Sequence, residues 1–322
     1  MGDDYLSLAA RVFSLYEERR FDEALSVADD VRTRFPDRAD RAYYWTACLR
    51  CLSGDSDAGL RSLQDGLRAG LWFAPDLLRS DGDLATLRGR SDFQLVVEES
   101  DRRWRHAQAT SRLELQVFPP SGLPRGVFIA LHGSNWRAEE TAPTWEAAVG
   151  VGMLLAVPQS SQVAGVNGYD WSDRDITEHD LGEAYRRLRS HGARDGMPIV
   201  LGGFSQGAGV AVTLAIDGTG FPVHGFVAVA PAFGGIGRPQ ADPSEAARRG
   251  VRGVMIVGEH DPYRPEGEEV QRGLAASGVR CDLVVEPGIG HVIPPGFESR
   301  LEMGVDIILR DGPRAKPSDV AL

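Results

Sequence analysis

The chain has 322 residues, enough for two domains, and 42% hydrophobic with 25% charged residues is the composition of an ordinary globular protein. Its formal net charge of −11 argues against a nucleic-acid partner, because neutralising phosphates requires a basic face. No apolar run reaches the roughly eighteen residues of a membrane span, and residues 1–4 lack the basic start of a signal peptide. We therefore expect a cytoplasmic protein without a membrane span.

The three cysteines fit a reducing compartment. Cys48 and Cys51 lack the second pair of ligands that a structural zinc site needs, so we expect them to be helix-core residues and predict no metal. Lys316 is the only lysine beside many arginines, which is typical of proteins from GC-rich bacterial genomes.

The first part of the chain, residues 1–106, has apolar residues at helical spacing, for example Ala24, Leu25, Ala28 and Val31. The segment Phe-Asp-Glu-Ala-Leu at residues 21–25 is echoed by Asp-Ala-Gly-Leu at residues 57–60. The offset between the two is close to the roughly 34-residue period of tetratricopeptide hairpins. We predict an α-helical, tetratricopeptide-like domain with helix pairs at residues 5–35 and 41–70 and a less regular helical stretch through residue 104.

The pattern changes to alternating strands and helices in residues 107–311, which predicts a doubly wound, mostly parallel α/β sheet. The expected strands are residues 113–118, 126–131, 154–157, 199–202, 225–230, 253–257 and 282–285. The expected helices are residues 142–149, 175–191, 206–216, 267–277 and 297–309. Residues 312–322, with two prolines, are expected to form a flexible tail.

Ser205 lies between the fourth of these strands and the helix that follows, with Gly203 and Gly207 on either side. A sharp strand-to-helix turn leaves no room for Cβ atoms beside its central residue, so this spacing predicts a nucleophile elbow. Serine is a poor nucleophile near neutral pH unless a histidine takes its proton and a carboxylate orients that histidine.

Two downstream residues fit those roles. His291 follows the last strand and precedes the last helix, and Asp261 follows the strand at residues 253–257, with Glu259 as a rival for the acid. We predict a catalytic triad of Ser205, His291 and Asp261.

An oxyanion hole is expected from two backbone N–H groups. One belongs to Gln206, directly after the nucleophile, and the other to Ser134, in the loop after the second strand.

These motifs resemble those of the carboxylesterase/phospholipase group of α/β-hydrolases, relatives of the acyl-protein thioesterases. The resemblance rests on Leu131-His132-Gly133, the Gly-Phe-Ser-Gln-Gly of residues 203–207, the Gly-x-x-Asp of residues 258–261 and Gly290-His291. It implies an α/β-hydrolase fold and ester or thioester hydrolysis without a metal or an organic cofactor.

One departure from the family pattern is the continuation Ser134-Asn135-Trp136, where relatives often have a small residue, Gly and Asp. It suggests an aromatic-walled acyl site formed by Trp136 and Trp171, with the alternative that both are ordinary loop anchors. The residues expected to contact substrate are His132, Gly133, Trp136, Trp171 and Phe233.

The sequence thus predicts a serine esterase or thioesterase acting on a small-molecule substrate, with a weak preference for a small acyl group. Alternatives are an acyl transferase or cyclase using the same triad, a prolyl-oligopeptidase-like peptidase, or an inactive scaffold. The helical domain is expected to act as a lid or to bind a carrier protein, because the hydrolase part leaves little sequence for a lid of its own. Two repeat pairs alone bury little core, so we also expect them to lean on the hydrolase part, on the irregular helical stretch or on a second subunit. Residues 71–73, Leu-Trp-Phe, either face the acyl site or fill the helical core.

Overall fold

The structure, a computed structural model, describes residues 5–310. These residues form two compact units: residues 5–111 with 163–168, and residues 112–162 with 169–310. None of the helices in the described part is both long and apolar enough to cross a membrane.

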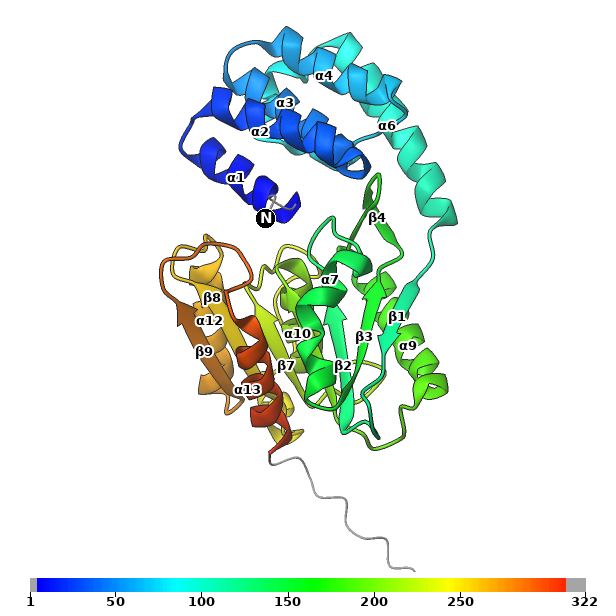
Figure 1. Ribbon diagram of the computed structural model, residues 1–322, viewed down its shortest axis with the longest axis vertical. Helices are drawn as coiled ribbons and strands as arrows, with labels where there is room; N and C mark the ends of the chain where they lie inside the picture. Colours follow the sequence, from blue (N-terminus) through cyan, green and yellow to red (C-terminus); the bar gives the residue numbers. More distant parts are fainter. Residues whose placement is uncertain (1–4, 311–322) are drawn as a thin grey trace, which may run out of the picture. The chain divides into compact units, whose positions relative to one another are not determined.

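The first unit is helical, as predicted, apart from residues 163–168, and its helices are coloured blue to cyan in Figure 1. Its elements are α1 (Tyr5–Glu17), α2 (Phe21–Arg34), η1 (Pro36–Arg38), α3 (Ala39–Leu52), α4 (Ser56–Arg68), α5 (Pro75–Ser80), η2 (Gly82–Leu87) and α6 (Ser91–Thr110). Helices α1 to α4 pack against each other in chain order. On α2 the buried residues are Ala24, Val27, Ala28 and Val31, so the apolar spacing of the sequence marks the face that meets the core. The tetratricopeptide-like assignment stays a prediction.

The core of this unit includes both cysteines of α3, Cys48 and Cys51, which are buried as predicted. Trp72 and Phe73 are also buried, with 7% and 3% exposure, so they pack inside the protein and do not present an apolar surface. The domain boundary expected at residue 106 falls inside α6. That helix continues to Thr110 because no helix-breaking residue interrupts it, and the compact units divide after Ser111.

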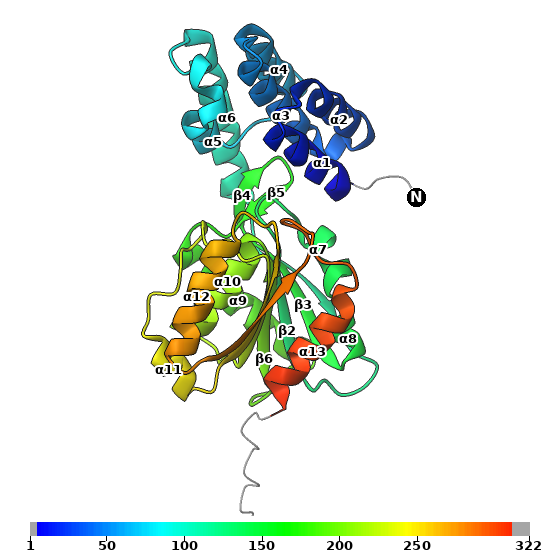
Figure 2. The ribbon, with the colours of Figure 1, turned by 90° about the vertical axis from the view of Figure 1, so that its left-hand side faces the viewer.

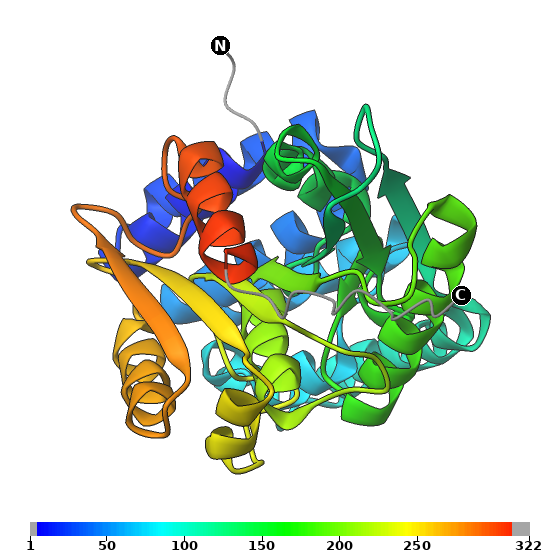
Figure 3. The same cartoon turned by 90° about the horizontal axis from the view of Figure 1, so that it is seen from below.

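The second unit contains a seven-stranded sheet in the order β1-β3-β2-β6-β7-β8-β9. Its strands are β1 (Glu114–Phe118), β2 (Gly126–Leu131), β3 (Met153–Gln159), β6 (Ile199–Phe204), β7 (Gly225–Val229), β8 (Arg252–Gly258) and β9 (Arg280–Glu286). All neighbours are parallel except β1, which runs antiparallel to β3. The doubly wound, mostly parallel sheet and its seven strands are therefore confirmed. Figure 3 shows the strands fanned by the twist of the sheet.

Helices cover both faces of this sheet, as Figure 2 shows. One face carries α7 (Ala138–Trp145), α8 (Ala147–Gly150) and α13 (Phe297–Leu309); the other carries α9 (Arg174–Leu188), η3 (Arg189–His191), α10 (Gln206–Asp217), α11 (Pro243–Arg248) and α12 (Arg264–Ala276). The single helix expected at residues 142–149 is instead two, separated at Glu146, and α11 was not predicted. Strands β2, β3 and β6 are buried along their whole length, which explains their continuous apolar sequences.

A two-stranded hairpin of β4 (Gln162–Gly165) and β5 (Gly168–Asp170) was also not predicted. Figure 2 shows its two strands side by side. Both strands are only three or four residues long, and the turn between them consists of Val166 and Asn167, so the sequence offers no strong hairpin signal there. The tip of the hairpin, residues 163–168, belongs to the helical unit. There the Trp104 indole donates to the Val163 carbonyl oxygen at 2.8 Å.

Candidate active site

Ser205 occupies a sharp turn between β6 and α10. Its backbone has φ 55° and ψ −121°, a region that residues with a Cβ rarely adopt. The surroundings hold it there: the Ser205 N–H donates to the Val229 carbonyl at 3.0 Å, and its carbonyl accepts from Ala232 at 3.1 Å. A Cβ added to Gly203 would lie 2.4 Å from the Gly207 carbonyl carbon, so strand and helix cross too closely for a side chain. The glycine spacing in the sequence reflects this close approach.

The side chains of Ser205, His291 and Asp261 form a continuous hydrogen-bond chain. His291 Nε2 lies 2.9 Å from Ser205 Oγ, and His291 Nδ1 lies 3.0 and 3.1 Å from the two carboxylate oxygens of Asp261. Because an ionised carboxylate only accepts hydrogen bonds, Nδ1 carries the ring proton and Nε2 accepts from the serine hydroxyl. This tautomer can take the serine proton.

The carboxylate that contacts His291 is that of Asp261, and its side chain is fully buried. The Tyr263 N–H donates to Asp261 Oδ1 at 2.9 Å and helps to fix its orientation. The rival Glu259 instead accepts from the Gly288 N–H at 2.8 Å. It thereby ties the loop that carries the acid to the loop that carries the histidine.

Two aromatic rings flank the imidazole of His291. The rings of Phe204 and Tyr263 have centroids 5.1 and 5.0 Å from that of His291. Sequence reasoning did not single out either residue, although Phe204 lies within the Gly-Phe-Ser-Gln-Gly motif and Tyr263 follows Asp261 by two residues. Tyr263 is 45% exposed, so its ring reaches solvent beside the imidazole.

The loop after β2 makes a tight turn from Gly133 to Trp136. The Trp136 N–H donates to the Gly133 carbonyl at 3.2 Å, and Asn135 has a positive φ of 58°, the features of a type II turn. This turn lies close to α10, because a Cβ on Gly207 would be 2.5 Å from the carbonyl oxygens of Leu131 and His132.

The structure resembles known proteins in both parts of the chain. Residues 4–108 match the family model of the A/B hydrolase-like N-terminal domain. A crystal structure of an uncharacterized protein from Bacillus cereus aligns with a TM-score of 0.50 at 22% identity, covering 96% of this chain and 99% of that one. The carboxylesterase of Bacillus cereus aligns with a TM-score of 0.51 at 17% identity, covering 63% and 98%. A carboxylesterase from Mesorhizobium loti aligns with a TM-score of 0.50 at 17% identity, covering 59% and 93%.

This chain has the α/β-hydrolase fold. No curated protein matches its sequence. At these identities the likeness concerns the fold, so the chemistry of this α/β-hydrolase-fold protein has to be argued from its own residues.

Four of the five residues expected to contact substrate are buried. His132 and Trp171 are fully buried, Gly133 is buried, and Phe233 is 6% exposed within the core. The Trp171 ring stacks on the His132 imidazole, with centroids 4.7 Å apart, and its indole N–H donates to the His132 carbonyl. The expectation that Trp171 walls the acyl site is therefore wrong, because its ring anchors the loop from inside. Trp136 is partly exposed and stacks on Phe204, with centroids 5.1 Å apart, so it remains at the site.

His132 is a neutral structural residue. Its Nε2 accepts from the Ser160 N–H at 3.2 Å, so the ring proton lies on Nδ1 and donates to the Gly133 carbonyl oxygen at 2.9 Å. Complete burial lowers the pKa of His132 to about 4, since a charged imidazole would lose its hydration there. The ring therefore stays uncharged near neutral pH and supports the turn that follows it.

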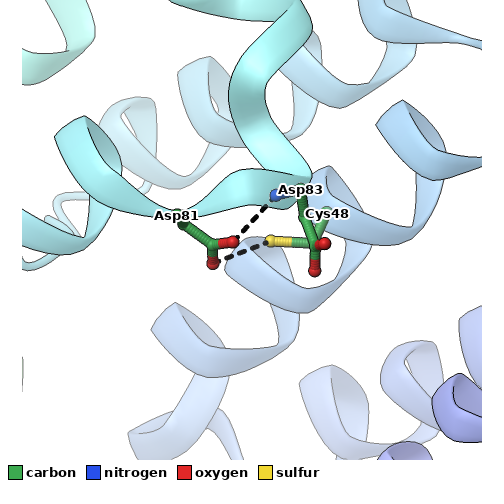
Figure 4. A group of neighbouring side chains, drawn as sticks. All are labelled: Cys48, Asp81 and Asp83. Atoms are coloured by element: carbon green, nitrogen blue, oxygen red, sulfur yellow. Dashed lines mark hydrogen bonds between the residues drawn. The ribbon is translucent and has the colours of Figure 1, made fainter.

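One further set of polar side chains lies in the helical unit, where Cys48, Asp81 and Asp83 have potential ligand atoms within 4.8 Å of one another (Figure 4). Asp81 accepts from the Asp83 N–H at 2.9 Å and from the Tyr44 hydroxyl at 2.6 Å, and the Tyr16 hydroxyl donates to Asp83 at 3.1 Å. Burial raises the pKa of the Cys48 thiol well above its usual value. We interpret the set as a hydrogen-bond network that joins α1, α3 and η2.

Proposed function

We propose that this protein is a serine hydrolase that cleaves a carboxylic ester or thioester through an acyl-enzyme. Ser205 attacks the carbonyl carbon while His291 takes its proton, and the buried Asp261 orients and stabilises the resulting imidazolium. His291 then protonates the leaving group, and a water molecule activated by the same histidine releases the acid.

The observation that carries the proposal is the unbroken chain from Ser205 Oγ through His291 to Asp261, with contacts of 2.9 to 3.1 Å. Nucleophile, base and orienting acid at these distances have the geometry that serine catalysis requires. The strained backbone at Ser205 adds support, because such outliers persist where the surrounding structure enforces them and cluster at active sites.

Two backbone N–H groups support an oxyanion hole. Gln206 is the first residue of α10, so its N–H has no partner within the helix, and Ser134 N–H has no acceptor among residues 5–310. We propose that these groups bind the negatively charged oxygen of the tetrahedral intermediate. Losing one such donor typically costs about 10²- to 10³-fold in kcat.

The substrate is expected to have a small acyl group, since the bulky Trp136 ring stacks on Phe204, the residue directly before the nucleophile. Of the two tryptophans, Trp136 is the one that limits the size of the acyl group, because Trp171 is buried. The accompanying predictions are a cytoplasmic location and a helical domain that binds a carrier protein or a second subunit.

The test compares the wild-type protein with Ser205→Ala on p-nitrophenyl esters of increasing chain length and on matching acyl thioesters. Both proteins are also exposed to a fluorophosphonate, which labels only an activated serine. Ser190→Ala is the matched control, because Ser190 is an exposed serine in η3. We expect turnover and labelling in the wild type and the control and neither in Ser205→Ala. A wild-type protein that neither turns over any ester nor becomes labelled would contradict the proposal.

A further inference from the structure

Three hydrogen-bond donors of the turn from Gly133 to Trp136 bind acceptors that hold the turn in shape. The Trp136 N–H closes the turn on the Gly133 carbonyl. The Ser134 hydroxyl donates to Asp170 Oδ1 at 2.8 Å, and the Asn135 N–H lies 3.0 Å from the same oxygen. The Ser134 N–H has no acceptor within the described residues. It is therefore available to a ligand.

Asp170 is the last residue of β5, and the residue before it is hydrogen-bonded to the turn. The Asn135 N–H donates to the Tyr169 carbonyl at 2.9 Å, and the Tyr169 N–H donates to the Trp136 carbonyl at 3.1 Å. These bonds place the Asp170 carboxylate on the peptide that links Ser134 to Asn135. The orientation of that peptide distinguishes a type II turn from a type I turn. Because the Asp170 carboxylate accepts the Asn135 N–H of this peptide, it favours the type II turn that the structure shows.

Trp171, which follows Asp170, connects this segment to Gln206, whose N–H is the second proposed oxyanion donor. The Trp171 N–H donates to the side-chain oxygen of Gln206 at 2.9 Å, and the Trp171 indole donates to the His132 carbonyl at 3.0 Å. The segment from Tyr169 to Trp171 therefore contacts both Ser134 and Gln206, whose backbone N–H groups have no acceptor among residues 5–310.

We propose that Asp170 is a positioning residue for the oxyanion hole. Its carboxylate holds the Ser134–Asn135 peptide in the type II orientation and accepts the Ser134 hydroxyl proton, so that Ser134 offers its N–H, and not its hydroxyl, to the developing oxyanion. This inference rests on the proposed serine hydrolase function. A preorganised donor acts mainly in the transition state, so the effect of Asp170 is expected in kcat.

Replacing Asp170 by Ala keeps the Ser134 N–H but removes the carboxylate that accepts from the Ser134 hydroxyl and the Asn135 N–H, so the orientation of the turn is no longer fixed. We expect kcat to fall about 10- to 100-fold, less than the full loss of a donor, with KM within about threefold of wild type. Asp170→Asn keeps the shape and one acceptor oxygen, so it is expected to recover most of the lost rate. Ser134→Ala removes only the hydroxyl donor and is expected to lower kcat about threefold. Combining it with Asp170→Ala should lower kcat by less than the product of the two separate effects.

The matched control is Asp173→Ala. Asp173 lies three residues further along and caps α9 by accepting from the Ile176 N–H at 3.0 Å, so its loss affects stability without touching the turn. The wild type and the five variants are compared by kcat and KM on a p-nitrophenyl ester that the wild type hydrolyses and by thermal unfolding. Equal destabilisation of Asp170→Ala and Asp173→Ala, with a loss of kcat only in the former, supports a positioning role.

Two results overturn the inference while leaving the proposed function intact. One is a kcat of Asp170→Ala within threefold of an active wild type. The other is a loss of activity in Asp170→Ala that lies in KM. An inactive, unlabelled wild type would instead count against the proposed function itself, and the Ser134→Ala measurement keeps the inference testable if Asp170→Ala does not fold.

Discussion

The elbow at Ser205 leads to an unusual prediction, namely that glycine is more stabilising than alanine at this position. The backbone values, φ 55° and ψ −121°, suit glycine and are strained for a residue with a Cβ. Such strain costs about 1–3 kcal/mol. Ser205→Ala keeps the strain, whereas Ser205→Gly relieves it but gains about 0.4–1 kcal/mol of unfolded-state entropy.

The difference leaves Ser205→Gly more stable than Ser205→Ala by about 1 kcal/mol, which corresponds to a Tm higher by about 2–4 °C for a domain of 150–250 residues. Both variants lack the nucleophile, so the comparison separates backbone strain from catalysis. The assay is thermal unfolding of the two full-length variants, followed by circular dichroism in the same buffer.

The control is the same exchange at an ordinary helical position. Ala275 is exposed on α12, where glycine is less favourable than alanine by up to about 1 kcal/mol. Ala275→Gly should therefore lower Tm, opposite in sign to the change from Ala to Gly at residue 205. If Ser205→Gly melts at the same temperature as Ser205→Ala or below it, the elbow is not strained and the reasoning is refuted.

Three further predictions concern the site. Asp261→Asn should lower kcat about 10⁴-fold by favouring the wrong imidazole tautomer, while Glu259→Gln, which keeps an acceptor for its backbone partner, should stay within about threefold. The pKa of His132 is lowered from 6.5 to about 4, so between these pH values the unfolded chain protonates this histidine and the folded protein does not. The free energy of unfolding is therefore highest above pH 6.5, and up to about 3 kcal/mol of it is lost as the pH falls toward 4. Urea unfolding between pH 4.5 and 7.5 should show this loss, and His132→Gln should lack it. Trp136→Ala should shift the ester chain-length optimum upward, whereas Trp171→Phe should leave it unchanged and cost only stability.

Much of the fold could be predicted because local sequence patterns reflect local structure. The continuous apolar runs of β2, β3 and β6 are those of strands buried on both faces, and the apolar spacing of α2 marks its core-facing side. The weak elements were missed: β4, β5 and α11 are three to six residues long and carry no periodicity that exceeds chance.

The site divides in the same way. The sequence by itself determined the elbow at Ser205, because glycines are required at Gly203 and Gly207, where the backbone leaves no room for a Cβ atom. Only the tertiary structure decided that Asp261 and not Glu259 contacts His291, and that Trp136 stays at the site while Trp171 is buried. These outcomes depend on contacts between side chains from separate loops, and the positions of such loops are set by the packing of the whole sheet, which no local pattern encodes.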